Sequence, residues 1–270
     1  MKMLNQYPLL HVINETHWIP KLYEFFGPGR STAAEMLAIV DMTHHVNGRP
    51  TTPLSQTQRD ALLAMPGQVT IREFADALAA SVAGVFGKSI WADKTPDYGM
   101  HMAMIQSLWP ECRFIHLIRD GAHVAQSMST HPGYRLLTAR DELSWTSIAH
   151  GMADMWTSTP PSDIDSFLRL WRFRVERARS EAKSLAEGTY VEVRYESLTA
   201  EPKPALRRIA AFTGLVRRDE SWLAAAAALI EPGRGAGRGV HVVTSRTDRR
   251  AVALMESLGY QASMSRGGRP

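Results

Sequence analysis

Two cationic side chains stand where the sequence leaves an apolar stretch, and both could bind an anion. Lys94 lies in the segment Trp91-Ala-Asp-Lys-Thr-Pro-Asp-Tyr98, at the end of a short strand-like run that a turn follows. A lysine there is a compact charge suited to phosphate or sulfate, near the positive end of the next helix. On spacing alone, an exposed lysine at a strand end is the favoured interpretation.

Arg119 ends the apolar run Phe-Ile-His-Leu-Ile, and Gly121 permits a tight turn into a helix. Ser127 follows eight residues after Arg119, about two helical turns on, and can face the same region. A guanidinium fork with a hydroxyl suits a phosphate monoester. A surface turn with a solvated Ser127 is an equally good interpretation of the pattern.

Glu15 follows the first strand-like run directly, in Asn14-Glu-Thr-His-Trp-Ile-Pro20. A carboxylate there could accept the proton of an attacking hydroxyl. It could also cap the next helix, and by itself we favour capping. Taken with Lys94 and Arg119, however, Glu15 is the third charged residue just past a strand end. The three together predict a crevice that binds anions at one edge of one sheet.

Short apolar strands that alternate with longer helical segments would position these residues. We expect strands at 9–13, 89–92, 113–118 and 189–194. We expect helices at 71–86, 98–108, 122–128, 163–186 and 203–212. Strands separated by helices imply crossover connections and a mostly parallel sheet, with ligands beyond the carboxyl ends of the strands. The pattern predicts a single α/β domain over residues 1–270.

Local signals mark the ends of several of these elements. Thr70 stands three residues before Glu73, which is the spacing of a capping box. Pro96 suits a turn or a first helical position, and Gly214 suits a helix end. We expect residues 47–57, which are polar and turn-prone, to form a surface loop.

A segment rich in glycine and arginine lies near the carboxyl end. Residues 231–246 contain four glycines within Pro232–Gly239, together with Arg234 and Arg238. We expect a flexible loop, and an anion-binding loop is the open alternative.

The composition excludes several classes of protein. Lys and Arg number 31 against 27 Asp and Glu, a net charge of +4 that does not require nucleic acid. The single Cys112 permits no intrachain disulfide, and we expect an inert thiol at the core edge. No apolar run is long enough to span a bilayer, and the amino terminus lacks the features of a secretory signal. We therefore expect a cytoplasmic protein without a membrane span.

Two stretches resemble the sulfotransferases that use 3'-phosphoadenosine 5'-phosphosulfate (PAPS). Asp93-Lys-Thr-Pro, then Trp109-Pro-Glu-Cys-Arg-Phe-Ile-His-Leu-Ile-Arg-Asp120, then Ser127 is similar to the family's central signature. Val193-Arg-Tyr-Glu-Ser-Leu198 resembles its Arg-Tyr-Glu-Asp-Leu segment, and Leu258-Gly-Tyr260 resembles a frequent ending of bacterial members. The likeness spans most of residues 5–260 in the right order. It implies a P-loop-like, three-layer fold with helices on both sides of the sheet.

The resemblance also implies roles for individual residues. Arg119 and Ser127 match the pair that binds the 3'-phosphate, and Lys94 matches a lysine near the transferring sulfuryl group. The segment beginning at Glu15 is similar to the Glu-Thr-Arg-Val-Ile-Pro segment of tyrosylprotein sulfotransferases, which makes Glu15 the expected base. His17 stands where that segment has Arg.

We further assign three residues to the binding of PAPS. They are Tyr195, Arg234 and Arg238.

One part of the family's pattern does not occur in the printed sequence. The family begins with a strand and a Pro-Arg-Ser-Gly-Thr-Thr loop, whose backbone amides and arginine hold the 5'-phosphosulfate at a helix start. Met3-Leu-Asn-Gln-Tyr-Pro8 resembles the end of the helix that follows that loop. We expect a truncated start site or a fragment, with a degenerate member as the alternative, and a sheet left with an exposed edge or groove.

The function implied by the resemblance is transfer of a sulfuryl group from PAPS to a hydroxyl or amine, without a metal. We expect activity to be impaired by the missing loop. A non-catalytic protein of the same fold and a P-loop kinase are the alternatives. The acceptor could be a small molecule, a carbohydrate or a peptide. The aromatics at 145, 156, 171 and 173 are expected to be core residues rather than walls of an acceptor site.

Overall fold

The computed structural model describes residues 1–45, 48–144, 162–215, 220–230 and 248–260. Its strands are β1 (Leu10–Asn14), β2 (Arg30–Thr32), β3 (Gln68–Thr70), β4 (Ile90–Lys94), β5 (Phe114–Ile118) and β6 (Tyr190–Arg194). The helices of the first half are η1 (Leu4–Gln6), α1 (Trp18–Phe26), α2 (Ala33–Asp41), α3 (Gln56–Leu63), α4 (Ile71–Gly84), η2 (Pro96–Met100) and α5 (Met102–Leu108). Those that follow are α6 (Gly121–Thr130), α7 (Pro132–Ala139), α9 (Ile164–Ala182), α10 (Tyr195–Ala200), α11 (Pro202–Thr213), α12 (Ser221–Ala227) and α13 (Arg249–Ser257).

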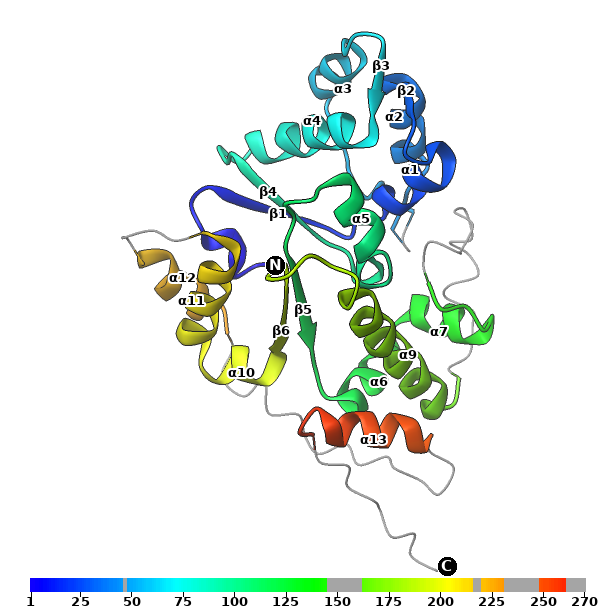
Figure 1. The fold of residues 1–270 in the computed structure, drawn as a ribbon, viewed down its shortest axis with the longest axis vertical. Helices are drawn as coiled ribbons and strands as arrows, with labels where there is room; N and C mark the ends of the chain where they lie inside the picture. Colours follow the sequence, from blue (N-terminus) through cyan, green and yellow to red (C-terminus); the bar gives the residue numbers. More distant parts are fainter. Residues whose placement is uncertain (46–47, 145–161, 216–219, 231–247, 261–270) are drawn as a thin grey trace, which may run out of the picture.

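The four expected strands are present, each within one or two residues of its predicted bounds. β1 pairs with β4 and β5 pairs with β6, both in parallel, while β2 and β3 form a short antiparallel pair. The α/β class with parallel strands is therefore confirmed. Among the described residues the parallel strands form two separate pairs rather than one continuous sheet. Figure 1 shows the two pairs running in different directions, with the amino terminus between them.

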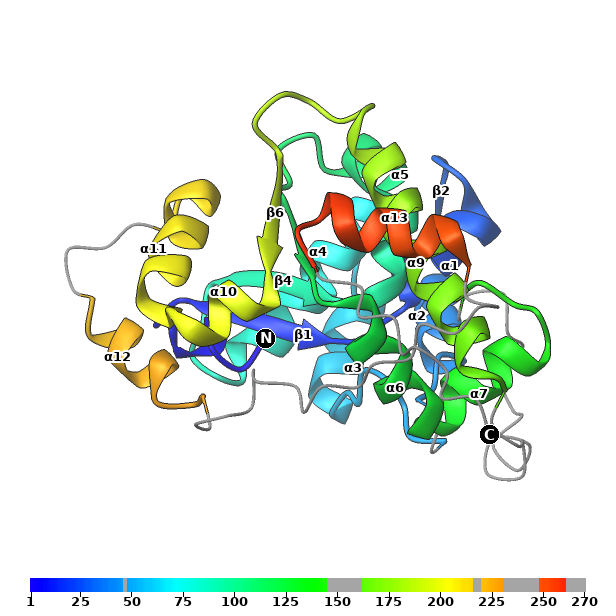
Figure 2. The same cartoon turned by 90° about the horizontal axis from the view of Figure 1, so that it is seen from below.

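Successive side chains of these strands pack on opposite sides, as pleated strands require. Trp91 of β4 packs against the cluster formed by α1, α2 and α4, whereas Ala92 packs against the cluster on α11 and α12. In the views of Figures 1 and 2, helices lie on both sides of the strands, which is the expected three-layer arrangement.

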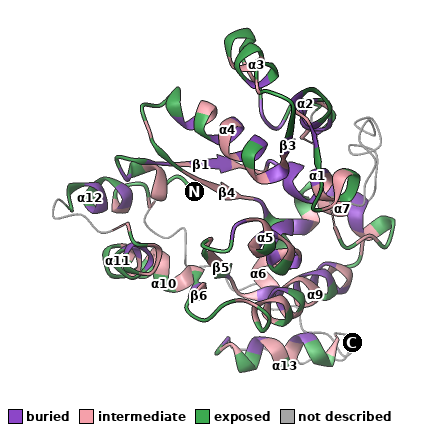
Figure 3. Cartoon of the chain, turned by 45° about the horizontal axis from the view of Figure 1, so that its top comes forward, coloured by how far each residue is buried: buried purple, intermediate pink, exposed green. Residues whose placement is uncertain are grey.

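Strands β4 and β5 are less buried than is usual for strands between two layers of helices. No residue of β4 is fully buried, and Leu117, the next-to-last residue of β5, is 48% exposed. The partly exposed strands are visible in Figure 3. Within the described chain, β4 pairs only with β1 and β5 only with β6, so one edge of each strand lacks a backbone partner. The expected exposed edge is thus found at both pairs.

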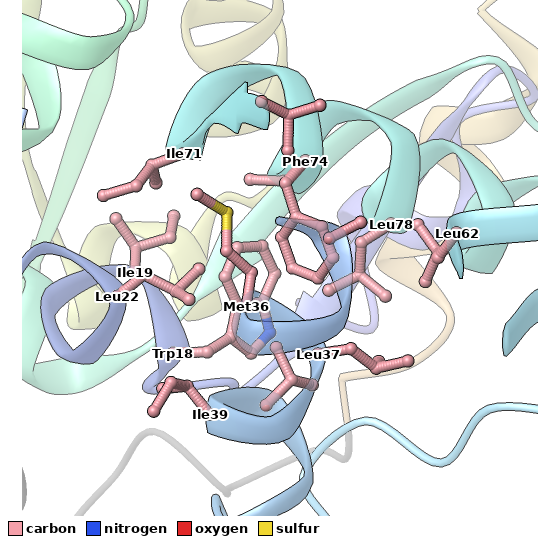
Figure 4. Packing of buried hydrophobic residues seen from close by; sticks show 14 of the residues in the cluster. Trp18, Ile19, Leu22, Met36, Leu37, Ile39, Leu62, Ile71, Phe74 and Leu78 are labelled. Atoms are coloured by element: carbon pink, nitrogen blue, oxygen red, sulfur yellow. The ribbon is translucent and has the colours of Figure 1, made fainter. Parts of the chain in front are cut away.

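The largest hydrophobic core cluster lies next to β1 and β4. Trp18, Leu22, Met36, Phe74 and Leu78 are all fully buried there. Figure 4 shows these side chains from α1, α2 and α4 packed together. A second cluster joins α6, α9 and α13, and a third joins β1 and β6 to α11 and α12.

Helix ends follow the sequence signals. Thr70 and Glu73 form the capping box that their spacing predicts, and η2 begins at Pro96. Gly214 ends α11 with a left-handed φ of 76°, a conformation that glycine adopts without strain. Thr32 with Glu35 and Ser55 with Gln58 form further capping boxes at α2 and α3.

The prediction of a surface loop at residues 47–57 is wrong in part. Thr51 and Thr52 are buried, and α3 begins at Gln56. The two threonines are drawn inward because their hydroxyls bond the turn after β1. The Thr51 hydroxyl donates to the Thr16 carbonyl at 3.0 Å, and the Trp18 indole donates to the Thr52 hydroxyl at 3.3 Å. Polar residues with such partners can be buried at little cost.

Candidate active site

Glu15 and Lys94 meet at the carboxyl ends of β1 and β4. The parallel register places Asn14 opposite Lys94, and the Glu15 amide donates to the Lys94 carbonyl at 2.8 Å. The Lys94 ammonium then lies 2.5 Å from a carboxylate oxygen of Glu15. Both side chains stay partly exposed, at 42% and 38%. An acid and a cation that sequence reasoning selected separately therefore form one ion pair that a ligand can reach.

Glu15 does not cap the next helix. The N-cap of α1 is His17, which makes no side-chain capping bond. Glu15 and His17 both adopt left-handed backbone angles, with φ of 51° and 56°. For residues other than glycine this conformation is uncommon and costs roughly 1–3 kcal/mol each. The turn after β1 is therefore strained on both sides of Thr16.

Hydroxyl groups fix Thr16 between these two strained residues. Its hydroxyl donates to Asp93 at 2.5 Å and lies 2.8 Å from the Tyr98 hydroxyl, while its amide donates to the Thr95 hydroxyl at 3.0 Å. The Thr95 hydroxyl donates to the other carboxylate oxygen of Asp93 at 2.7 Å. Sequence reasoning assigned no role to Thr16, Asp93, Thr95 or Tyr98, although three of them lie within the quoted Asp-Lys-Thr-Pro segment or two residues beyond it.

Lys94 controls the charge on Glu15. Burial raises the pKa of Glu15, but the hydrogen bond and charge of Lys94 lower it, with smaller contributions from His17 and His45. The net pKa lies below the ordinary value of a glutamate. Glu15 is thus ionised at neutral pH and can accept a proton only once its partner has moved.

Arg119 stands at the carboxyl end of β5, next to the end of β6. Its guanidinium lies over the ring of Tyr195, 4.7 Å from the ring centre. The neighbouring Glu196 accepts from the Asp120 amide at 3.1 Å and from the Tyr260 hydroxyl at 2.9 Å. Two of the residues assigned to nucleotide binding, Arg119 and Tyr195, are therefore in contact, and the turns that carry them are tied together.

Ser127 lies on the exposed side of α6, and among the described residues its hydroxyl has no hydrogen-bond partner. No hydrogen bond joins the side chains of Ser127 and Arg119 in the described part of the chain. His131, one turn beyond Ser127, lies close enough to Glu15 for the carboxylate to raise the pKa of His131, although burial keeps that pKa below the ordinary value. The end of α6 therefore lies near the Glu15–Lys94 pair.

Helix α9 connects the two strand ends that carry the candidate residues. It packs along α6, which follows Arg119, and against η2, which follows Lys94. The contact with α6 is tight, because a Cβ added to Gly121 would meet the Trp171 ring at 2.7 Å. At η2, a Cβ added to Gly99 would lie 3.3 Å from Ala178. One helix thus fixes the relative position of both segments.

A pocket of about 310 Å³ opens beside η2 and α9. Met100, Leu143 and Phe173 form its apolar wall, with Ser144 beside them. The Ser144 hydroxyl donates to the buried Asp97 at 2.8 Å. Phe173 thus lines a pocket, contrary to the expectation of a core residue, whereas Trp171 is a core residue with 4% exposure.

Several expected features fall outside the description or concern absences. Arg234, Arg238 and the 231–246 loop lie outside the described residues, as do Trp145 and Trp156. Cys112 is packed at the core edge, and burial raises the pKa of its thiol to about 12. Within the described ranges, no group of three metal-binding side chains gathers. Nor does any described helix have the length and apolar character to cross a membrane.

Comparison with known proteins gives matches in sequence and in structure. Residues 1–219 match the sequence profile of the sulfotransferase family. The nodulation protein NoeE of Sinorhizobium fredii (strain NBRC 101917 / NGR234) is 29% identical over 148 residues. That alignment covers 53% of this chain and 33% of NoeE, so the match spans about a third of the length of this curated relative.

Two solved structures resemble the fold over nearly the whole chain. The sulfotransferase domain of the curacin biosynthetic pathway has a TM-score of 0.56 at 15% identity, covering 97% of this chain and 92% of that domain. The sulfotransferase domain of the Synechococcus PCC 7002 olefin synthase has a TM-score of 0.53 at 16% identity, covering 96% and 88%. At these identities the likeness is one of fold.

Proposed function

The chain belongs to the sulfotransferase family, and from this premise we propose that its site moves a sulfuryl group from PAPS to a hydroxyl or amine acceptor. The observation that carries the proposal is the Glu15–Lys94 pair at the ends of two parallel strands. A carboxylate and an ammonium on neighbouring strands supply a proton acceptor and an anion-binding charge within reach of one reacting centre.

The proposed step follows the logic of in-line phosphoryl transfer. The acceptor oxygen or nitrogen forms a bond to sulfur, while the bond from sulfur to the bridging phosphate oxygen breaks. The electron pair of that bond stays on the leaving phosphate, where Lys94 stabilises the developing charge. The proton of the acceptor passes to the Glu15 carboxylate. No metal is needed to balance the step.

The ion pair must open before either residue can act. With its partner 2.5 Å away, the Lys94 ammonium is engaged by Glu15 rather than by a donor. An incoming sulfate group competes for Lys94 and would free Glu15. The proton affinity of Glu15 would then rise, because the Lys94 hydrogen bond and charge, which lower its pKa most, would be lost. Donor binding and activation of the base are thereby coupled.

Arg119, Ser127 and Tyr195 are proposed to hold the nucleotide rather than to take part in chemistry. Arg119 presents a guanidinium that Tyr195 orients from one face. The fork that remains can bind a phosphate in two hydrogen bonds. Ser127 has a hydroxyl open to solvent on the helix that follows. Arg234 and Arg238 stay predictions for the same ligand.

The acceptor is proposed to enter by the pocket beside η2. His17 lies near both Glu15 and Asp97. Burial lowers the pKa of His17 most, while the carboxylates of Asp97 and Glu15 both raise it. Asp97 in turn bonds Ser144 on the pocket wall. The apolar wall formed by Met100 and Phe173 suits the carbon body of a small molecule, carbohydrate or peptide acceptor.

The 270 printed residues are proposed to bind PAPS weakly. They contain no Pro-Arg-Ser-Gly-Thr type loop for the 5'-phosphosulfate. Each charge-assisted hydrogen bond contributes about 1.5–3 kcal/mol. Losing two or three weakens binding by roughly a thousandfold or more. Calorimetry with adenosine 3',5'-bisphosphate tests this, and micromolar binding would contradict it.

The experiment that tests the function is sulfate transfer from radiolabelled PAPS to a panel of acceptors. It is run on the 270-residue chain and on a longer version. The longer version adds the Pro-Arg-Ser-Gly-Thr loop, where in-frame codons for one precede Met1. We expect transfer by the longer version and its loss on Lys94→Gln. A longer version that binds the nucleotide but labels no acceptor, with or without Lys94, would instead support a non-catalytic protein.

A further inference from the structure

A closed set of hydrogen bonds lies directly beneath the Glu15–Lys94 pair. Every polar group of Thr16 takes part, because its amide, carbonyl and hydroxyl bond Thr95, Thr51 and Asp93 respectively. The Tyr98 hydroxyl also contacts the Thr16 hydroxyl and accepts from the Ile19 amide at 3.4 Å. Thr16 itself is completely buried. The turn after β1 is thereby anchored to β4 and to the start of η2.

This anchoring explains how the strained backbone persists. Left-handed φ values at two non-glycine residues are maintained only where the surroundings over-determine them. Thr16 lies between the two, and its hydrogen bonds oppose the relaxation of Glu15 and His17 together. The Thr16 hydroxyl ends at Asp93, where both carboxylate oxygens are occupied, one by Thr16 and one by Thr95.

Asp93 acts on Glu15 from the opposite side of the strand. Asp93 and Lys94 are successive residues of β4, so their side chains leave the strand on opposite faces. Lys94 contacts Glu15, whereas Asp93 contacts Thr16. Asp93 therefore lies on the opposite side of β4 from the reacting centre. Its side chain bonds Thr16 and Thr95 and is not placed to contact the donor or the acceptor.

We propose that Asp93 is a positioning residue: by accepting from Thr16 and Thr95 it fixes the strained turn that presents Glu15 to Lys94. The meaning of this arrangement for catalysis rests on the proposed function. The arrangement itself does not, because it concerns groups that are paired before any substrate is bound.

The test measures the pKa of the Glu15 carboxyl by NMR titration of protein labelled with carbon-13 at the glutamate carboxyls. Glu15→Gln assigns the signal. Lys94→Gln gives the full upward shift that follows when the lysine is removed. We expect Thr16→Val, which deletes the anchoring hydroxyl at nearly constant volume, to raise the pKa of Glu15 by at least half of that shift. Asp93→Ala, which removes both oxygens that contact Thr16 and Thr95, is expected to move it in the same direction.

Two further variants separate positioning from general loss of structure. Thr16→Ser keeps the hydroxyl and is expected to retain the wild-type pKa of Glu15. Thr43→Val deletes a hydroxyl that is equally buried but bonds the Ile39 carbonyl instead. We expect Thr43→Val to leave the pKa of Glu15 unchanged even where it lowers the melting temperature.

The inference is overturned if Thr16→Val and Asp93→Ala fold and leave the pKa of Glu15 at its wild-type value. It is equally overturned if Thr43→Val shifts that pKa as far as Thr16→Val does. Should Thr16→Val fail to fold, Asp93→Ala alone decides by the same criterion. The NMR measurement needs no donor or acceptor. A chain that shows these pKa shifts but transfers no sulfate would therefore support the inference and contradict the proposed function.

Discussion

Lys94 and Glu15 neutralise each other's charge while no ligand is bound, so the resting site is not a strong anion trap. Among the assigned residues that the structure describes, the remaining cation is Arg119, whose guanidinium lies over the Tyr195 ring rather than against a carboxylate. Nucleotide binding should therefore depend on Arg119 more than on Lys94, because binding at Lys94 must first break an ion pair. The single-residue predictions follow from this asymmetry.

Arg119→Lys should weaken the binding of adenosine 3',5'-bisphosphate by roughly tenfold to a hundredfold. The ammonium keeps the charge but loses the two-pronged contact and much of the stacking on Tyr195, at a cost of about 1.5–3 kcal/mol. NMR titration measures even millimolar dissociation constants. Arg113→Lys, at the start of the same strand and bonded to the Phe212 carbonyl, is the matched control and should leave binding unchanged. Equal losses from both variants would show that Arg119 does not contact the ligand.

Asp93 should make the free energy of unfolding fall as the pH rises from about 4 to about 7. Burial raises the pKa of Asp93 to about 7, despite lowering by Thr16, Thr95 and Lys94. In the unfolded chain an aspartate titrates near 3.9. The folded protein therefore binds the proton more tightly, and its contribution to stability, present in full below about pH 4, is lost up to about pH 7.

The measurement is urea unfolding of wild type and Asp93→Asn between pH 4.5 and 8. Other acids contribute to both curves, so the difference between them isolates Asp93. We expect wild type to lose on the order of 3 kcal/mol relative to Asp93→Asn across this range, as an upper figure. Parallel curves would mean that Asp93 is ionised throughout.

At the scale of elements, the close approach of α6 to α9 sets where Arg119 and Ser127 lie. Gly121 opens α6 directly against the Trp171 ring, which leaves no room for a side chain. The same helix α9 packs on η2 and hence on the segment after Lys94. A shift of α6 along α9 would therefore change the position of Arg119 and Ser127 relative to Glu15 and Lys94.

Gly121→Ala should destabilise the fold by about 1–3 kcal/mol, because its Cβ would overlap the Trp171 ring and force one helix to move. It should also weaken nucleotide binding, since Arg119 lies two residues earlier. Thermal unfolding and the NMR titration report the two effects. Gly84→Ala is the control: it lies at the end of α4 with nothing within 4 Å of an added Cβ. It should be neutral or slightly stabilising, and a comparable loss there would refute the steric explanation.

At the scale of the whole molecule, the carboxyl-terminal helix closes over the ends of β5 and β6. Tyr260, just past α13, donates to Glu196 and lies 3.3 Å from the Ile118 carbonyl. The Arg194 guanidinium lies over its ring at 4.3 Å. A residue at the far end of the described chain thus braces the turns that carry Arg119 and Tyr195.

Tyr260→Phe should lower the free energy of unfolding by about 1–2 kcal/mol, because one carboxylate oxygen of Glu196 and the Ile118 carbonyl lose the Tyr260 hydroxyl as donor. Urea unfolding measures the change. Tyr23→Phe removes a hydroxyl that bonds nothing among the described residues and should cost little. If the two variants unfold alike, the brace contributes nothing and the ending is only a surface contact.

Much of this architecture was predictable because its signals are local. The β-branched and aromatic runs of β5 and β6 predict strands wherever they pack, and the Thr70–Glu73 spacing predicts a helix start. The charges at strand ends were also readable, since Lys94, Glu15 and Arg119 each end or follow an apolar run. The resemblance added the family, which the sequence profile confirms.

The tertiary structure alone decided which of these pieces meet. Glu15 and Lys94 are 79 residues apart, and only the register of β1 with β4 makes them an ion pair. Likewise the burial of Thr51 and the strained turn at Thr16 depend on partners far along the chain. Local sequence determines what conformation a segment prefers, because that energy arises between neighbouring residues. Its partners are chosen by packing and hydrogen bonding across the whole chain, so two strand pairs, one connecting helix and a buried network of hydroxyls became visible only in three dimensions.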